Sequence, residues 1–147
     1  MEEIVVIAEK IRKLKAEKKA VILAHYYVSD EIQAIADYVG DSFYLSKIAK
    51  NTDAEIIVFC GVSFMGESAA IMNPNKKVLM PDLNADCAMA HMVDIAKIRE
   101  LRNKYEDLAV VCYINSTAEI KTYSDVCVTS ANAVKVVRNL PNQNVFF

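Results

Sequence analysis

Glycine, proline and tryptophan are scarce in this chain of 147 residues. It contains three glycines, three prolines and no tryptophan, whereas 54% of its residues are hydrophobic. Disordered and low-complexity segments are rich in glycine, proline and polar residues, so this composition excludes them and favours a packed structure. A chain of this length forms one ordinary domain or two small ones.

Charge of one sign and long apolar runs are also missing. The formal net charge is −2, and acidic and basic residues are interspersed. The sequence has no basic stripe interleaved with aromatic residues, so we expect no nucleic-acid partner. Its apolar runs are far shorter than the roughly 20 residues of a membrane span, and the acidic segment 1–10 is unlike a signal peptide. We therefore predict no membrane association and a cytoplasmic location.

The four cysteines follow no spacing that is typical of a zinc site or a Cys-x-x-Cys redox motif. They stand at positions 60, 87, 112 and 127. In a reducing cytosol we expect them to be thiols. Cys60, Cys112 and Cys127 lie among Val, Ile, Phe or Tyr, and we interpret them as small buried hydrophobic residues. Cys87 lies in a polar loop and needs a separate interpretation.

Short apolar runs alternate with segments of helical periodicity along the whole chain. The pattern predicts a helix over 3–18, a strand over 20–24, and a helix that is capped by Ser29 or Asp30 and includes Val39. The elements expected after these are a helix ending near 51, strand 55–60, a helix ending before 73, strand 77–81, helix 93–104, strand 108–114, helix 118–123, strand 125–129, helix 131–140 and strand 144–147. This alternation predicts an α/β fold with short parallel sheets between helical layers.

The stretch 22–42 aligns without a gap with a second stretch 88 positions later, and the alignment continues through Lys47. The identities are Glu31 with Glu119, Ile32 with Ile120, Asp37 with Asp125, Ser42 with Ser130 and Lys47 with Lys135. We infer an internal duplication and predict two homologous α/β/α domains, 1–86 and 87–147. Counterparts of residues 60–87 are missing from the second domain, so we interpret the chain as the amino-terminal part of a longer protein.

Polar residues follow the expected strands where open α/β sheets usually bind ligands, at their carboxyl ends. His25 and Tyr27 follow the first strand, and Tyr113 and Asn115 are their counterparts in the duplicate. Cys87 follows strand 77–81. One such cysteine from each repeat would suit an iron–sulfur cluster with one open iron position, whereas the alternative is a free surface thiol.

Six motifs occur in order along the chain: AHYY at 24–27, GDS at 40–42, FCGVSFMGE at 59–67, VLMPD at 78–82, YINSTAEIK at 113–121 and VCVTSANA at 126–133. Together they resemble the quinolinate synthase family. The resemblance implies three homologous α/β/α domains around a pseudo-threefold axis, of which this chain holds the first and part of the second. It also implies that each domain supplies one cysteine to a central [4Fe–4S] cluster.

The resemblance also implies roles for single residues. Cys87 is expected to be a cluster ligand, with two further cysteine ligands outside this chain, and Tyr27 and His25 are expected to be catalytic. The expected substrate contacts are His25, Ser42, Tyr113, Ile114, Asn115 and Ser130. Asp86 and Ala88 depart from the Gly and Ser that are commoner in the family, and a carboxylate at 86 would disfavour a negatively charged cluster.

The family condenses iminoaspartate with dihydroxyacetone phosphate to quinolinate in NAD biosynthesis, with the cluster as Lewis acid. An aspartate oxidase or dehydrogenase is the expected supplier of iminoaspartate. The site motifs contain no arginine, so Ser42 and Ser130 are expected to cap helices whose N–H groups bind the substrate anions. We expect the chain to be inactive alone. The alternative function is a non-catalytic α/β module that binds small anions.

Overall fold

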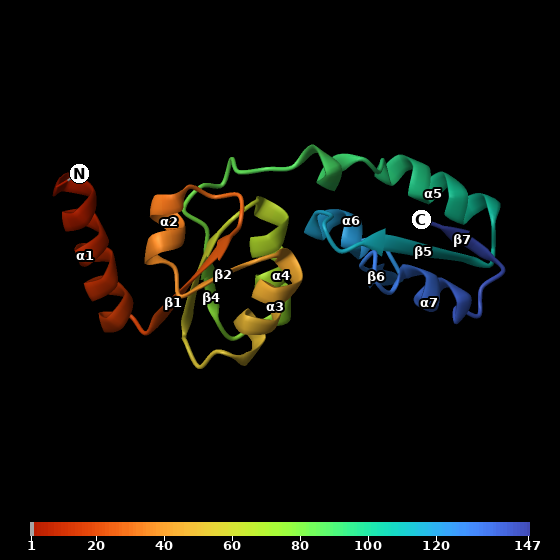
Figure 1. Ribbon diagram of the computed structural model, residues 1–147. Coiled ribbons are helices and arrows are strands. Elements are labelled where there is room, and N and C mark those ends of the chain that lie inside the picture. The colour runs from red at the N-terminus through yellow and green to blue at the C-terminus, as the bar shows by residue number, and fades with distance from the viewer. Residues whose placement is uncertain (1) are drawn as a thin grey trace. The chain divides into compact units, whose positions relative to one another are not determined.

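The computed structural model describes residues 2–147, and the chain divides into two compact units. Unit 1 is Met1–Asp86 and unit 2 is Cys87–Phe147. Each unit contains one sheet of parallel strands with helices in the connections (Figure 1). The α/β class expected from the alternation of strands and helices is therefore confirmed. No helix in residues 2–147 is both long and apolar enough to span a bilayer.

Unit 1 contains a four-stranded parallel sheet in the order β2-β1-β3-β4. Its elements are α1 Glu2–Glu17, β1 Ala20–His25, α2 Asp30–Ile35, β2 Tyr38–Gly40, α3 Ser42–Asn51, β3 Ile56–Cys60, α4 Ser63–Met72 and β4 Lys77–Leu79. Helix α3 packs against α4 and β1, and α1 packs against α2 and β1. Because β1 is an interior strand with helices against it, its segment 21–24 is fully buried.

The core of unit 1 joins β1 and β3 to the helices that follow them. Leu23 and Phe59 are register partners and are 0% and 1% exposed. Leu45 of α3 and Phe64 of α4 are also buried. Burying a side chain of this size contributes about 1.5–3 kcal/mol to folding, so these residues fix the strand ends that follow them.

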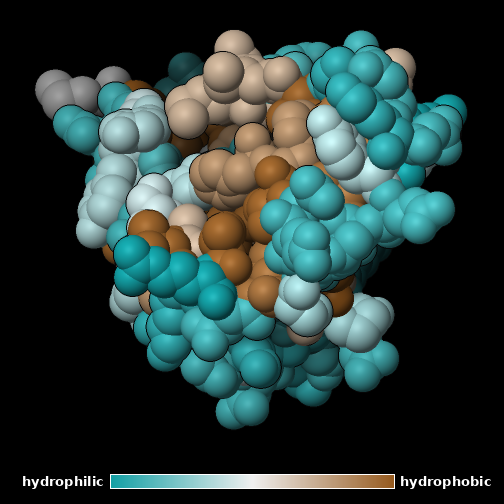
Figure 2. All heavy atoms as spheres, turned by 90° about the vertical axis from the view of Figure 1, so that its right-hand side faces the viewer, coloured by the Kyte–Doolittle hydropathy of each residue, from teal (hydrophilic) through white to brown (hydrophobic). Residues whose placement is uncertain are grey.

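Unit 2 contains a three-stranded parallel sheet in the order β6-β5-β7. Its elements are η1 Ala88–His91, α5 Ile95–Lys104, β5 Leu108–Tyr113, α6 Ala118–Thr122, β6 Val126–Val128, α7 Ala133–Arg138 and β7 Asn144–Phe146. Ile98, Leu108 and Val110 form its core cluster, and Phe146 packs against them. Figure 2 shows apolar side chains gathered in the middle of one face and framed by hydrophilic ones.

The two sheets repeat each other in strand order and in register. Strands β2-β1-β3 correspond to β6-β5-β7. The pair Leu23↔Tyr38 recurs as Val111↔Val126, exactly 88 positions later, and every printed β1–β2 pair recurs in the same way. The β1–β3 pair at the start of the strands also recurs between β5 and β7. The repeat inferred from the sequence is therefore a repeat of backbone structure.

The helix expected to include Val39 was too long, and so was the helix expected over 131–140, because α7 spans only Ala133–Arg138. Helix α2 ends at Ile35, and Val39 lies in strand β2 instead. The cause is Asp37, whose backbone N–H donates to the Ile22 carbonyl at 2.9 Å while its Oδ2 accepts from the Ile22 N–H at 2.8 Å. These two bonds draw the chain against β1 and begin the parallel pairing. The strand expected over 77–81 is likewise shorter, because β4 ends at Leu79.

The cysteines differ from the expectation that three of them are buried. Cys112 is buried and Cys60 is half-buried, and burial raises the pKa of the Cys60 thiol. Cys127 is exposed, so the expectation is wrong for this residue. The physical reason is its position on β6, which is an edge strand of a three-stranded sheet and has a neighbour on one side only.

Candidate functional site

The carboxyl ends of three neighbouring strands meet in unit 1. His25 ends β1, and its register partner Gly40 ends β2. Gly61 follows β3, and a Cβ added there would lie 3.4 Å from the His25 Cβ. Asp41 and Ser42 come directly after β2. The structure thus brings His25 and the GDS motif to the same edge of the sheet, as parallel strands require.

His25 is held as a neutral imidazole. Its Nδ1 accepts the backbone N–H of Tyr27 at 3.3 Å, which leaves the other ring nitrogen as the N–H donor in the neutral form. Burial lowers the pKa of His25, and the nearby Asp41 carboxylate offsets part of that lowering. At neutral pH the other ring nitrogen therefore carries a proton that it can donate.

Tyr27 projects from the loop that follows β1. It is 92% exposed, and its ring lies edge-on to the His25 ring with centroids 4.7 Å apart. The loop backbone is nevertheless fixed, because the Gln33 side-chain amide donates to the carbonyls of Tyr26 at 3.1 Å and Val28 at 2.9 Å. A phenol on a fixed backbone and in open space has the access that a proton-transfer group requires.

Ser42 is the first residue of α3 and does not cap it. The N-cap is Asp41, whose Oδ1 accepts the Tyr44 N–H at 2.7 Å. Asp41 has the extended backbone of a cap, whereas Ser42 is already helical. The expectation that Ser42 caps α3 is therefore wrong. Its hydroxyl remains at the start of the helix, next to Asp41, whose carboxylate acts to raise the pKa of His25.

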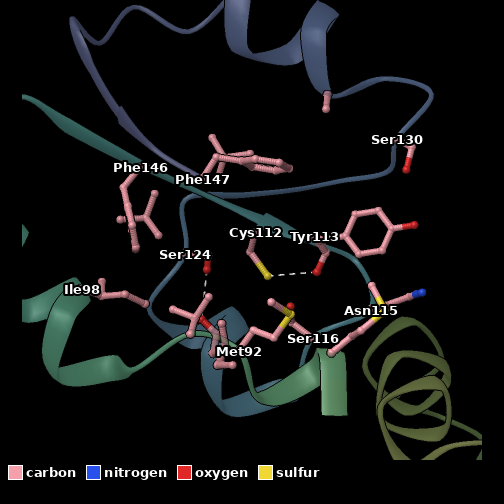
Figure 3. Close-up of a pocket in the computed structure, with 16 residues that line it drawn as sticks. Met92, Ile98, Cys112, Tyr113, Asn115, Ser116, Ser124, Ser130, Phe146 and Phe147 are labelled. Atoms are coloured by element: carbon pink, nitrogen blue, oxygen red, sulfur yellow. Dashed lines mark hydrogen bonds between the residues drawn. The ribbon is translucent and has the colours of Figure 1, made fainter. Parts of the chain in front are cut away.

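Unit 2 contains a cavity of about 510 Å³ at the carboxyl end of β5 (Figure 3). Three of the expected substrate contacts, Tyr113, Asn115 and Ser130, line it. Its other lining residues are Met89, Met92, Val93, Ile98, Val110, Val111, Cys112, Ser116, Ile120, Ser124, Ala133, Phe146 and Phe147. Ile114 is not among them, and its N–H donates to the Val128 carbonyl at 2.8 Å. The cavity is mostly apolar with a few polar groups, as is typical of small-molecule sites.

Ser130 lies in the turn before α7 and does not cap that helix either. The N-cap is Asn132, and α7 begins at Ala133. The Asn132 Oδ1 accepts the Thr129 N–H at 2.7 Å and so closes the turn that carries Ser130. The expectation that Ser130 caps a helix is therefore wrong, because the amide two residues later is better placed to close the turn.

Cys87 is half-buried and precedes η1, where its carbonyl accepts the Ala90 N–H at 2.9 Å. The neighbouring Asp86 accepts a hydrogen bond from the Ser63 hydroxyl at 3.3 Å. Residues 2–147 contain no group of three or more His, Cys, Asp or Glu side chains that could hold a metal ion. The described residues therefore do not complete a metal site by themselves.

Comparison with known proteins decides the family. The family model described as "Quinolinate synthetase A protein" matches residues 9–147. The chain belongs to the quinolinate synthetase A family. It is 62% identical over 138 residues to the quinolinate synthase of Fusobacterium nucleatum, covering 94% of this chain and 46% of that protein. It is 57% identical over 141 residues to the quinolinate synthase of Dehalococcoides mccartyi strain 195, covering 96% and 47%.

The quinolinate synthase of Caldicellulosiruptor bescii is 54% identical over 142 residues, with 97% of this chain and 47% of that protein covered. The chain thus spans about half the length of the curated members of the quinolinate synthetase A family that it matches.

Sequence reasoning missed two residues that shape this site in the quinolinate synthetase A chain. Asp41 lies inside the GDS motif, and its position between a strand end and a helix start could have marked it as a cap. Gln33 lies in α2 and reaches back to the loop that carries Tyr27. No local pattern indicates such a contact, because it depends on how the loop folds over the helix.

Proposed function

We propose that the complete protein is a quinolinate synthase and that this chain supplies part of its active site. The observation that carries the proposal is the match of residues 9–147 to the family model, with 62% identity to a protein named quinolinate synthase. The proposed reaction joins iminoaspartate and dihydroxyacetone phosphate and releases quinolinate, one phosphate and two waters. It involves no net oxidation or reduction, so it needs proton transfer and loss of leaving groups.

His25 and Tyr27 are the proposed proton-transfer groups. The neutral His25 ring and the exposed Tyr27 phenol lie within 4.7 Å of each other, measured between ring centroids. Enamine formation and dehydration each need a proton to be removed from one atom and delivered to another. The neutral His25 ring can deliver its N–H proton, and the Tyr27 phenol beside it can exchange a second one.

Hydrogen-bond donors without formal charge are the proposed contacts to the anionic substrates. Tyr113, Asn115 and Ser130 line the unit 2 cavity and offer a phenol, an amide and a hydroxyl. Ser42 offers a second hydroxyl at the start of α3, and Ile114 is proposed as a contact through its side chain, because its N–H donates to the Val128 carbonyl. Carboxylate and phosphate oxygens accept hydrogen bonds from such groups, and the apolar remainder of the cavity strengthens them by excluding water.

We further propose that Cys87 is one of three thiolate ligands of a [4Fe–4S] cluster. When bound, such a cluster supplies a Lewis acid through its open iron position. Because the described residues fit only one ligand, we expect this chain alone to hold no cluster and to be inactive. We also propose a cytoplasmic location and an iminoaspartate supply from an aspartate oxidase or dehydrogenase.

A chimera tests this proposal. Residues 9–147 of this chain, which match the family model, would replace the corresponding segment of the Fusobacterium nucleatum quinolinate synthase, which is 62% identical over 138 residues. The purified anaerobic chimera should contain about four irons per chain and form quinolinate. Cys87→Ala should abolish cluster loading, and the matched variant Cys60→Ala should not. A folded chimera that binds phosphate but holds no iron and makes no quinolinate would support the small-anion module instead.

A further inference from the structure

Two thiols of unit 2 lie side by side on neighbouring strands. Cys112 on β5 and Cys127 on β6 are register partners, and register partners in a parallel pair direct their side chains to the same face. Neighbouring strands are about 4.8 Å apart, which lies within the roughly 4.4–6.8 Å that separates the Cα atoms of a disulfide. The register therefore places the two Cα atoms at a separation that a disulfide can span.

The two thiols differ in their access to solvent. Cys127 is exposed, whereas Cys112 is 6% exposed and lines the cavity. A small oxidant can therefore reach Cys127 first, and the buried Cys112 can then react with the modified Cys127. Redox-active cysteines are solvent-accessible and often have a second, resolving cysteine beside them, and Cys127 and Cys112 meet these two conditions.

Unit 1 shows that the fold itself does not require thiols at this position. The equivalent register pair, 88 positions earlier, is Ala24↔Val39, which has the same backbone pairing and two apolar side chains. At the equivalent position, unit 1 has the same backbone pairing but no thiol that could be oxidised. Of the two sheets, only the sheet of unit 2 has two thiols at this register position.

We propose that Cys112 and Cys127 form a reversible disulfide site on the β5–β6 pair. The Cys127 thiolate attacks one sulfur of a small disulfide RS–SR, which forms a mixed disulfide and releases RS⁻. The Cys112 thiolate then attacks the Cys127 sulfur, which forms the Cys112–Cys127 bond and releases the second RS⁻. The two protein thiols lose two electrons and two protons, and RS–SR gains both to become two RSH.

The disulfide would change the cavity that Cys112 lines. In the thiol form, the Cys112 S–H donates to the Tyr113 carbonyl at 3.1 Å (Figure 3). The disulfide has no S–H group, so this donor is lost beside Tyr113 and Asn115. Any effect of oxidation on substrate binding rests on the function proposed above, whereas formation of the disulfide does not.

The pKa of the Cys127 thiol controls the rate of oxidation. Burial and the neighbouring Cys112 raise the pKa of Cys127, and Lys121 offsets part of that rise. Since the thiolate is the attacking species, exchange should be slow at neutral pH. Its rate should rise about tenfold per pH unit until the pH reaches the pKa of Cys127.

The test is disulfide mapping of the 147-residue chain with Cys60→Ala and Cys87→Ala. The folded chain would be treated with hydroxyethyl disulfide at pH 8, and folding would be checked by circular dichroism. We expect a mass lower by two hydrogen atoms, no adduct, and no free thiol. The tryptic peptides 105–121 and 122–135 should be linked, and a reductant should separate them.

Two controls make the result decisive. Cys127→Ser on the same background should leave Cys112 unmodified, because Cys112 is buried. The unsubstituted chain should give the same 112–127 link, which guards against a folding defect in the double variant. A stable mixed adduct on Cys127 with Cys112 still titratable, or a covalent dimer through Cys127, would overturn the proposal. Since no readout depends on activity, failure here is distinct from failure of the proposed function.

Discussion

Asp37 and Asp125 make the same two hydrogen bonds in the two halves of the chain. The Asp37 carboxylate accepts the Ile22 N–H at 2.8 Å, and its own N–H donates to the Ile22 carbonyl at 2.9 Å. The Asp125 carboxylate accepts the Val110 N–H at 2.7 Å, and its N–H donates to the Val110 carbonyl at 2.8 Å. Each aspartate thus links the start of an edge strand to the neighbouring buried strand by two hydrogen bonds.

A basic side chain on the helix before each central strand, α1 or α5, forms an ion pair with the aspartate. Lys15 of α1 lies 2.6 Å from an Asp37 carboxylate oxygen, and Arg102 of α5 lies 2.9 Å from an Asp125 carboxylate oxygen. These ion pairs are partly exposed, so each adds at most about 1 kcal/mol. The hydrogen bonds to the backbone of the central strand matter more, because that strand is buried.

We predict that Asp37→Ala lowers the free energy of unfolding by about 1–3 kcal/mol, because it leaves the Ile22 N–H without its acceptor. Asp125→Ala should cost a similar amount. Asp37→Asn keeps an acceptor oxygen and should cost less than Asp37→Ala. Urea unfolding measures all three, with the exposed Glu9→Ala as control, expected within about 0.5 kcal/mol of the unsubstituted chain. Equal losses for Asp37→Ala and Glu9→Ala would contradict the assigned role.

Tyr27→Phe in the chimera should lower kcat by about 10²–10⁴-fold, because the phenol proton is lost. The fold should be unaffected, since Tyr27 is 92% exposed. Steady-state kinetics with matched cluster content measure the effect. The control is Tyr26→Phe, which removes the same hydroxyl from the neighbouring residue and should change kcat little. A larger loss for Tyr26→Phe would transfer the proposed role to that residue.

Gln33→Leu should loosen the loop that carries Tyr27, because both hydrogen bonds to the Tyr26 and Val28 carbonyls disappear. We expect faster amide hydrogen exchange in residues 26–29 and about a tenfold lower kcat in the chimera, since a misplaced catalytic group slows the reaction. KM should change less than kcat. Unchanged exchange with a lowered kcat would show that Gln33 acts in another way.

Acidification should destabilise the chain partly through His25. Because burial lowers the folded-state pKa of His25 below its ordinary 6.5, the unfolded chain binds a proton more readily than the folded chain. Stability is therefore intact above about pH 6.5 and falls as the pH decreases through the folded-state pKa. His25→Gln should reduce the loss between pH 7 and pH 5. Urea midpoints at both pH values give the comparison, and an equal loss in the variant would contradict it.

The alternation of elements and the 88-residue repeat could be predicted because both are carried by the chain's own spacing. Apolar runs of strand length separated by helical periodicity dictate parallel sheets. Once Asp37 and Asp125 are equivalent, the registers of β1 with β2 and of β5 with β6 follow from the same offset.

The errors arose where distant contacts outweigh local pattern. Val39 has helical spacing from Ile32 and Ile35, yet pairing with Ala24 places it in a strand. Ser42 is a good cap residue, yet its neighbour Asp41 takes that position.

The local sequence pattern also could not predict which residues are exposed at the edge of a sheet. Cys127 has apolar neighbours in the sequence, but its exposure depends on what lies beside β6 in the sheet.

The shared register has a practical consequence for protein engineering. Since matching positions have the same strand order and register, side chains can be exchanged between equivalent positions of the two sheets. His25 and Tyr113, which both end a central strand, are the natural pair to exchange. The residue at the carboxyl end of each central strand can therefore be replaced without changing the pairing of that strand.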